Sequence, residues 1–270
     1  MTIAAIIIGS SLLIGILWVI TIAGRIGNPE LDKFMKQRYA HRGLHNEERP
    51  ENSLAAFKAA ADKGYAIELD VHLLADGYIG VMHDYRLLRT TGRVGYIKDL
   101  TRAELKDYKL EGTDEHIPTL QEVLEVVDGR VPLLIEIKNT KTNAILCSAL
   151  SWEMRNYKGE WCIESFDPRC VRWFKKHRPD VVRGQLIQNF FKDHSQLQLF
   201  FGIILTSMCT NILCQPDFIA HKFEDRNNLA NLIARDFWNM KGFSWTITNE
   251  KAMKKAEKMG NAIIFEDFEP

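Results

Sequence analysis

Residues 66–84 read AIELDVHLLADGYIGVMHD and determine the fold that we expect. Two short runs rich in apolar and β-branched residues, 66–73 and 78–82, are typical of β-strands. The turn ADG at residues 75–77 is too short for a crossover helix, so it predicts a hairpin. Similar runs predict further strands at residues 39–40, 132–137, 161–165, 181–187, 217–220, 243–248 and 262–265.

Helix-like segments separate several of these nine strands. Residues 53–63 follow Pro50 and Glu51, and Asn52 or Ser53 can cap a helix there. Residues 119–127 and 250–259 have a similar character. Strands that alternate with helices over about 240 residues favour a parallel α/β sheet, and the length suits a closed (β/α)8 barrel. A barrel has eight places, so one strand of the hairpin is expected to lie outside the parallel set, and the sequence does not say which.

Chemically reactive side chains gather at the carboxyl ends of the early strands, which meet at one mouth of a barrel. Glu68 and Asp70 are two residues apart and therefore face the same side of a strand. Glu136 and Lys138 repeat this spacing. The whole set consists of His41, Arg42, Glu68, Asp70, His83, Glu136 and Lys138.

Three carboxylates cannot lie together in a desolvated mouth without compensation, because like charges repel and burial of each ion costs several kcal/mol. A bound divalent cation compensates them, and oxygen ligands favour Mg²⁺ or Ca²⁺ over zinc. Arg42 has a planar fork that suits a phosphate, and two histidines supply an acid and a base. Together these groups indicate phosphodiester cleavage. Taken singly, Glu68 could instead pair with Lys138, and His83 could be a structural histidine at a strand end.

Five short motifs, in this order and spacing, resemble the glycerophosphodiester phosphodiesterase family, and specifically a membrane-anchored bacterial-type member. The motifs are HRG at 41–43, PEN at 50–52, ELDV at 68–71, HD at 83–84 and EIK at 136–138. The similarity continues through LRTTG at 88–92, IPTL at 117–120 and WTITN at 245–249, and it covers essentially the whole chain after residue 24.

The resemblance implies a distorted TIM barrel with a small insertion after the third strand, at about residues 85–130. By resemblance, the acid/base pair is His41 and His83, the ligands of one Mg²⁺ or Ca²⁺ ion are Glu68, Asp70 and Glu136, and the phosphate-binding residues are Arg42 and Lys138. Glu51 would orient His41 or Arg42 rather than bind the metal. Trp245 would line the pocket beside the glycerol moiety, or else be a buried core residue.

The implied reaction is hydrolysis of a glycerophosphodiester to glycerol 3-phosphate and an alcohol. Three alternatives remain open. The enzyme could act on lysophospholipids at the membrane as a lysophospholipase D. It could be a phospholipase C of the phosphatidylinositol type, which shares the barrel and the histidine pair. It could also be a catalytically silent, membrane-tethered binding module, although every motif residue is intact.

The amino-terminal segment differs from the rest of the chain. Residues 1–24 carry no charged side chain, and the apolar run 3–23 is long enough to cross a bilayer. No Lys or Arg precedes this run, which favours an uncleaved transmembrane anchor over a signal peptide. We expect a juxtamembrane linker at 25–37 and the catalytic barrel at 38–270. The basic residues that follow the anchor are Arg25, Lys33, Lys36 and Arg38, and they place the barrel on the cytoplasmic side.

Two later features complicate the barrel. Residues 197–214 are uncharged, which fits a barrel element that dips into the membrane interface, plain packing in the barrel, or, least well, a second transmembrane helix. The family's closing pattern GVDGIITDxP is replaced after WTITN by GNAIIFED at residues 260–267. A helix that would cover the barrel after the last strand is missing, so we expect the strand but leave closure of the barrel in doubt.

Charge and cysteine content exclude other classes of protein. The 270 residues contain 35 basic and 35 acidic side chains, so no basic surface for nucleic acid is expected. The five cysteines are odd in number and lack CxxC spacing. They indicate neither a disulfide framework nor a zinc site, and each is expected to be a small buried apolar residue.

Overall fold

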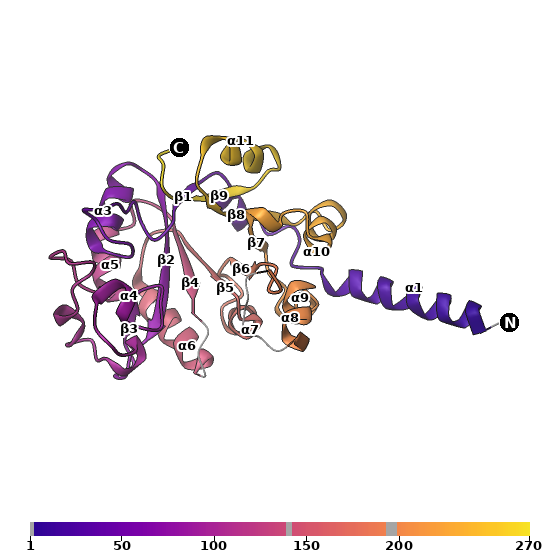
Figure 1. Ribbon diagram of the computed structural model, residues 1–270, viewed down its shortest axis with the longest axis horizontal. Helices are drawn as coiled ribbons and strands as arrows, with labels where there is room; N and C mark the ends of the chain where they lie inside the picture. Colours follow the sequence, from indigo (N-terminus) through magenta and orange to yellow (C-terminus); the bar gives the residue numbers. More distant parts are fainter. Residues whose placement is uncertain (1–2, 139–141, 193–198) are drawn as a thin grey trace.

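The centre of the protein is a closed barrel of parallel strands, shown by a computed structural model that describes residues 3–138, 142–192 and 199–270 (Figure 1). Each barrel strand pairs with its neighbours in parallel, and β1 pairs with both β2 and β9, which closes the ring. The strands are β1 (Arg38–Ala40), β2 (Ala66–Leu73), β3 (Ile79–Val81), β4 (Leu133–Ile137), β5 (Trp161–Ser165), β6 (Arg183–Ile187), β7 (Phe218–Lys222), β8 (Lys241–Ile247) and β9 (Ala262–Phe265). All nine predicted strands are therefore confirmed.

The hairpin supplies the ninth strand. β3 pairs antiparallel with β2, with Val71 opposite Val81 and Leu73 opposite Ile79. β4 then takes the parallel place beside β2, with Asp70 opposite Glu136. The strand outside the parallel set is therefore β3, which the sequence alone could not decide.

Side chains of β2 alternate between two environments. Ile67, Leu69 and Val71 are fully buried in the apolar layer between the strands and the outer helices. Ala66 belongs instead to the apolar interior of the barrel. Residues two apart face the same side, so Glu68 and Asp70 stand above Ala66 inside the barrel. The interior is thus apolar at its floor and acidic toward the carboxyl ends of the strands.

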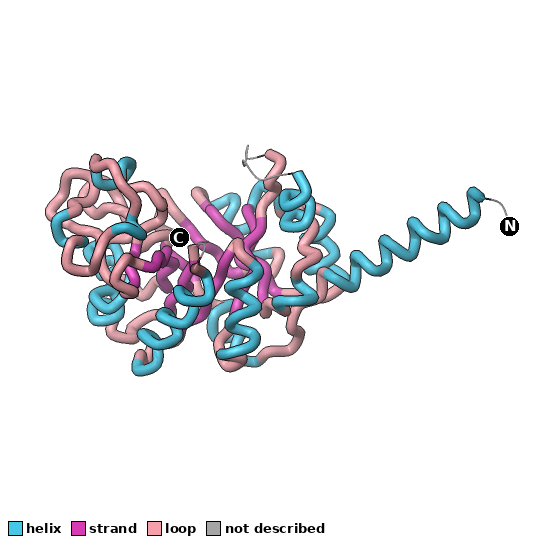
Figure 2. The backbone as a smooth tube through the Cα atoms, turned by 90° about the horizontal axis from the view of Figure 1, so that it is seen from below, coloured by secondary structure: helices cyan, strands magenta, loops and turns pink. Residues whose placement is uncertain are grey.

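Helices form the outer layer, and most of them lie outside the strands in Figure 2. The longer ones on the barrel are α3 (Leu54–Asp62), α5 (Leu120–Val127), α6 (Asn143–Glu153), α7 (Pro168–His177) and α11 (Glu250–Lys258). Ser53 caps α3 by accepting a hydrogen bond from the Ala56 amide at 3.1 Å, an interaction worth about 1 kcal/mol. Thr119 and Glu122 form a reciprocal capping box on α5. The three predicted helices are confirmed, whereas α6 and α7 were not predicted.

The segment expected to be a linker closes the amino-terminal end of the barrel. It contains a 3₁₀ turn, η1 (Pro29–Leu31), and α2 (Asp32–Met35). Leu31 and Phe34 are buried among the side chains of the barrel floor. Residues 25–37 therefore act as a plug as well as a connection.

The segment after β3 has a small core of its own. It contains α4 (Leu88–Thr91), η2 (Ile97–Asp99) and η3 (Leu105–Asp107). Its buried apolar side chains are Met82, Leu87, Ile97, Leu100, Leu105, Leu110 and Ile117, and Leu74 from the turn between β2 and β3 packs with them. The next element, α5, packs in the main core instead. The inserted unit is therefore shorter than the expected 85–130, because α5 belongs to the outer layer of the barrel.

The last strand closes the barrel without a helix after it. β9 pairs with β1, with Tyr39 opposite Ile264, and the His41 amide donates a hydrogen bond to the Phe265 carbonyl at 2.9 Å. Residues 266–270 form no helix. The doubt about closure is thus resolved, because strand pairing alone completes the ring.

The amino-terminal helix α1 (Ile3–Thr21) extends away from the barrel (Figure 1). It is 19 residues long, none of them buried, and it is long and apolar enough to cross a membrane, a property that signal sequences share. Within the described residues, the later apolar segment forms two short helices, α8 (Leu199–Thr206) and α9 (Asn211–Cys214). Neither can span a bilayer. Residues 197 and 198 lie outside the described part of the chain.

Short elements complete the chain. They are η4 (Met154–Asn156), η5 (Phe223–Asp225), α10 (Leu229–Leu232) and the π-helical turn η6 (Ile233–Phe237). All five cysteines are free thiols. Four of them are buried, as expected, and Cys209 is partly exposed.

Candidate active site

The barrel mouth brings the predicted reactive residues together from four strands. Glu68, Asp70 and Glu136 each offer an oxygen within 4.8 Å of the other two, and all three residues are buried. The close approach follows from strand register, because β2 and β4 are neighbours and Asp70 lies opposite Glu136. No strand end elsewhere in the described part of the chain offers a comparable group of metal-binding side chains.

A lysine compensates part of this negative charge. The Lys138 ammonium lies 2.7 Å from Asp70 Oδ1 and 2.8 Å from Glu136 Oε1. Burial works against ionisation of Asp70, but the charges of Lys138, His83 and Arg42 outweigh it and hold the pKa of Asp70 well below its usual range. The sequence left open whether Lys138 pairs with Glu68, and the structure pairs it with the other two carboxylates.

The other two carboxylates are less well compensated. Burial, followed by repulsion from Asp70 and Glu136, raises the pKa of Glu68 well above its usual range. Burial likewise raises the pKa of Glu136 to about 7, although Lys138 opposes the shift. One ammonium is therefore insufficient for three buried carboxylates, and this donor set fits a divalent cation with oxygen ligands.

Arg42 is held over this cluster by unusual backbone geometry. Its φ of 54° lies in the left-handed region, where side chains other than glycine are uncommon. The Arg42 amide donates a hydrogen bond to Glu68 Oε2 at 2.9 Å, and the guanidinium lies 3.6 Å from Asp70 Oδ2. Gly43 follows with a φ of 82°, and a Cβ there would lie 2.9 Å from Ala56 atoms. The HRG motif is therefore a tight turn that places a cation beside the acidic cluster.

The PEN motif supports the same turn. Glu51 accepts two hydrogen bonds from Arg42 at 3.1 Å and also binds Arg89. The Asn52 side chain donates from Nδ2 to Asp70 Oδ2 at 2.8 Å, and its backbone N–H donates to the Arg42 carbonyl at 2.9 Å. Glu51 is thus hydrogen-bonded to Arg42, and its role in orienting Arg42 during the reaction stays a prediction.

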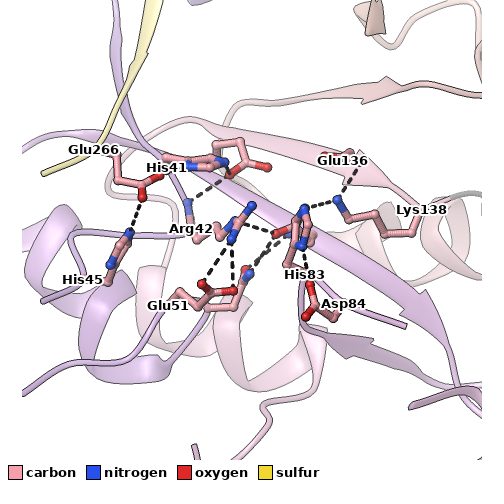
Figure 3. A network of polar contacts seen from close by, with 12 residues as sticks. His41, Arg42, His45, Glu51, His83, Asp84, Glu136, Lys138 and Glu266 are labelled. Atoms are coloured by element: carbon pink, nitrogen blue, oxygen red, sulfur yellow. Dashed lines mark hydrogen bonds and ion pairs between the residues drawn. The ribbon is translucent and has the colours of Figure 1, made fainter. Parts of the chain in front are cut away.

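His41 is oriented by the residue that follows the last strand. Its Nδ1 forms a short hydrogen bond with Glu266 Oε2, and its Nε2 lies 3.9 Å from Glu68 Oε2 (Figure 3). A carboxylate only accepts, so Nδ1 carries the proton and Nε2 is the basic atom. Burial acts to raise the pKa of Glu266, but the hydrogen bond and charge of His41 outweigh it and lower that pKa to about 2. Glu266 therefore remains ionised beside the imidazole.

His83 has a carboxylate partner of its own. Its Nδ1 donates to Asp84 Oδ1 at 2.7 Å, and Arg89 binds the other oxygen of Asp84 at 2.6 Å (Figure 3). Burial opposes ionisation of Asp84, but Arg89 and His83 lower its pKa to about 2. Both candidate acid/base histidines thus have Nδ1 fixed by an acid. Burial lowers the pKa of both His41 and His83.

Cavities flank the cluster on two sides. One of about 440 Å³ is lined by His83, Lys138, Tyr85 and Phe166. Another of about 820 Å³ lies on the other side, next to Glu51 and Glu266. Trp245 is partly buried, and its ring meets that of Phe166 edge to face at 5.8 Å. Trp245 packs on the barrel core and on Phe166, which lines the first cavity, and its place beside the glycerol moiety stays a prediction.

Several residues with a place in this site were not predicted from sequence. Asp84 directly follows His83 in the HD motif, and this adjacency could have suggested the hydrogen bond between the two side chains. For Asn52, the sequence indicates membership of the PEN motif and a possible helix cap, but not its hydrogen bond with Asp70. Glu266 occupies the position where the family's closing pattern has Asp, so alignment of that pattern could have identified it. Arg89 could not be identified, because its pairing depends on how the inserted unit folds over the mouth.

Removal of the Glu266 carboxylate charge is expected to impair His41 without moving the metal ligands. Glu266→Gln should lower kcat for glycerophosphodiester hydrolysis about 100-fold with little change in KM, since partners that orient a reacting histidine are worth factors of this size. Steady-state kinetics on the purified protein will measure both constants. Glu257→Gln is the matched control, because Glu257 pairs with Arg38 at the surface of the barrel. Equal kinetics for Glu266→Gln and wild type would show that Glu266 does not orient His41.

Comparison with known proteins assigns this barrel and its acidic mouth to a family. The model of the glycerophosphoryl diester phosphodiesterase family matches residues 41–269. A glycerophosphodiester phosphodiesterase of Bacillus altitudinis is 42% identical over 257 residues, which cover 87% of this chain and 95% of that protein. A lysophospholipase D of Rattus norvegicus is 36% identical over 270 residues, which cover 87% of this chain and 84% of that protein. The chain belongs to the glycerophosphoryl diester phosphodiesterase family and is an enzyme of that class.

Solved structures share the fold. A glycerophosphodiester phosphodiesterase of Thermotoga maritima has a TM-score of 0.66 at 26% identity and covers 85% of this chain and 94% of its own. A phosphodiesterase of Oleispira antarctica, solved with sn-glycerol-3-phosphate, has a TM-score of 0.67 at 23% identity and covers 86% of this chain and 93% of its own. The TIM-barrel prediction and the family prediction are therefore confirmed.

Proposed function

We propose that this enzyme hydrolyses glycerophosphodiesters to glycerol 3-phosphate and an alcohol with the help of one divalent cation. The single observation that carries this proposal is the group of three buried carboxylate oxygens within 4.8 Å of one another, placed between two histidines. Glu68, Asp70 and Glu136 would hold Mg²⁺ or Ca²⁺. The bound cation would neutralise the charge that develops on the phosphoryl oxygens.

The phosphate would be held by cations of the chain itself. Arg42 presents its guanidinium beside Asp70, and Lys138 lies over Asp70 and Glu136. Arg42 can take two phosphoryl oxygens through its fork, whereas Lys138 acts as a point charge. This arrangement concentrates positive charge where negative charge increases in the transition state.

The two histidines would move the protons. One imidazole takes the proton from the glycerol 2-hydroxyl, whose oxygen attacks phosphorus, and the other gives a proton to the oxygen of the departing alcohol. The cyclic phosphate is then opened by water with the two roles exchanged, which yields glycerol 3-phosphate. His41 and His83 suit this exchange because Glu266 and Asp84 hold each ring by Nδ1 and leave Nε2 as the reacting atom.

Identification of the phosphorus-containing product tests this function. Phosphorus NMR of a reaction with glycerophosphocholine and Mg²⁺ or Ca²⁺ should show glycerol 3-phosphate as the product. Phosphocholine would mean cleavage of the other ester bond, and inositol 1-phosphate from a phosphoinositide would indicate a phospholipase C. Either result would overturn the proposed reaction.

Lysophospholipids are the second candidate substrates. The similarity to a lysophospholipase D and the aromatic side of the smaller cavity favour them. With lysophosphatidylcholine, the same bond cleavage would release choline and leave lysophosphatidate. A ratio of kcat/KM values for the two substrates decides between a water-soluble and a membrane-borne substrate.

For localisation, we propose that α1 is an uncleaved single-pass anchor and that the barrel lies on the cytoplasmic side. The positive-inside rule supports this orientation, since the basic residues follow the helix. Protease treatment of inside-out and right-side-out vesicles is the test, and the barrel should be digested only in the inside-out preparation.

A further inference from the structure

The helix α8 and its surroundings expose an apolar surface near the barrel mouth. Phe200 is 67% exposed and Leu199 is 69% exposed. Phe191, Phe201 and Ile203 are each about half exposed on the same element or beside it. No Asp, Glu, Lys or Arg occurs from residue 199 to residue 215. We call these five side chains the α8 face, and exposed apolar patches of this kind mark contact sites for proteins or membranes.

The end of α1 is fixed against the same region. Trp18 Nε1 donates to the Ser207 carbonyl at 3.0 Å, directly after α8. Trp238 Nε1 donates to the Val19 carbonyl at 2.8 Å. Asn211 on α9 donates to the Ile22 carbonyl at 3.0 Å. These three hydrogen bonds therefore fix the orientation of α1 relative to the barrel.

This orientation places the α8 face level with the end of α1 that joins the barrel. A helix of 19 residues rises about 28 Å, close to the thickness of a bilayer's hydrocarbon core. Trp18 and Trp238 lie at its barrel end, and tryptophan is enriched at the boundary between hydrocarbon and water. The elements beside this end are α8, α9 and α10 (Figure 1). If α1 crosses the membrane, these elements lie at its surface.

The segment beside the α8 face also packs against a wall of the catalytic cavity. A Cβ on Gly202 would lie 3.3 Å from the Phe191 ring, so that ring packs on α8. The neighbouring Phe190 meets Phe166 edge to face at 5.9 Å. Phe166 lines the cavity that contains His83 and Lys138. The segment that carries Phe190 and Phe191 therefore contacts α8 on one side and the aromatic wall of the catalytic cavity on the other.

We propose that α1 and the α8 face form one membrane-contacting surface, and that the occupant of the α8 face is the lipid bilayer. This inference rests on the proposed anchor. A second protein copy would also be an apolar partner, but the continuity with the membrane-spanning helix favours lipid. The surface brings the aromatic side of the catalytic cavity to the bilayer, so that a lysophospholipid can reach the phosphate site without passing through water.

Direct contact with lipid can be measured on the full chain in phosphatidylcholine vesicles. Phe200→Cys is labelled with an environment-sensitive fluorophore in a Cys209→Ser background, because the other four cysteines are buried. The emission should shift to the blue, and lipids with a spin label on the acyl chain should quench it. Val94→Cys is the matched control, since Val94 is 91% exposed on the inserted unit, and it should show neither effect.

Two results would overturn the proposal. In the first, the emission wavelength and the quenching by labelled lipid are the same at position 200 as at position 94. The other is a blue shift without quenching by the labelled lipid, which would indicate contact with a second protein copy. Catalysis does not enter either measurement, so failure of the proposed reaction is distinguished from failure of the membrane surface.

The catalytic consequence is tested separately. In vesicles, the double variant Phe200→Glu/Phe201→Glu should lower kcat/KM for bilayer-borne lysophosphatidylcholine about tenfold or more, because a charge in the interface opposes insertion. It should leave hydrolysis of water-soluble glycerophosphocholine unchanged, and Val94→Glu should change neither. Equal loss on both substrates, or no loss on lysophosphatidylcholine, would contradict delivery of substrate through this surface.

Discussion

His83→Ala is expected to abolish measurable turnover of glycerophosphocholine, and His41→Ala should do the same. A positioned acid or base contributes about 10²–10⁴-fold to the rate, and in the proposed mechanism each histidine would serve both as acid and as base over the two steps. Folding should be kept, because both side chains lie at the mouth and outside the apolar clusters of the barrel. Steady-state assays will measure the loss, and circular dichroism will check the fold.

The control for these variants is His116→Ala. His116 contacts Glu122 at 3.3 Å, away from the acidic cluster, and its loss should leave kcat unchanged. Near-wild-type activity of His83→Ala would contradict the acid/base assignment. Cation binding by a wild-type protein that turned over neither proposed substrate would favour a silent binding module instead.

Removal of divalent cations should lower kcat at least about 100-fold, since a bound cation supplies several kcal/mol of transition-state stabilisation. Activity after chelation should return on addition of Mg²⁺ or Ca²⁺. Glu136→Gln should raise the cation concentration needed for half-maximal activity about 10–100-fold. Full activity in excess chelator would contradict a metal-dependent mechanism.

Glu164→Gln is the matched control for this experiment. Glu164 lies on β5 directly opposite Glu136 and is equally buried, but it is outside the three-oxygen cluster. Burial raises the pKa of Glu164 well above its usual range, which favours the neutral carboxyl group, and an amide is a close substitute for that group. The cation requirement of Glu164→Gln should therefore match that of wild type.

Cation binding should also depend on pH. Glu136 has a pKa of about 7 in the folded protein, above its ordinary value of 4.5. Its ionisation therefore costs stability as pH rises from about 4.5 to 7, and a bound cation offsets this cost. Calorimetry should show Ca²⁺ affinity at least about tenfold higher at pH 8 than at pH 6, with proton release. Affinity that does not change over this range would contradict ligation by Glu136.

The strands were predictable because their signals are local. In β2, alternation places Glu68 and Asp70 on the interior face, and the short turn after Leu73 requires a hairpin. α6 was missed because its apolar residues are not confined to one face and Thr142 makes no side-chain cap. α7 has a recognisable start signal in Asp167, which caps the helix, and Pro168, which begins it.

The candidate site was predictable only in part. Its candidate reacting residues lie in compact motifs, so spacing and family resemblance could point to them. The residues that orient them come from distant segments: Glu266 reaches His41 through the pairing of β9 with β1, and Arg89 reaches Glu51 from the inserted unit. The first pair depends on barrel closure and the second on how the inserted unit folds over the mouth, and sequence spacing encodes neither.

The most direct test is a crystal structure of the protein with Ca²⁺ and glycerol 3-phosphate. The ion should lie about 2.3–2.6 Å from an oxygen of each of Glu68, Asp70 and Glu136. The phosphate should contact Arg42 and Lys138. An ion bound elsewhere, or a phosphate away from these residues, would contradict the central claim that this cluster is a metal-dependent phosphodiesterase site.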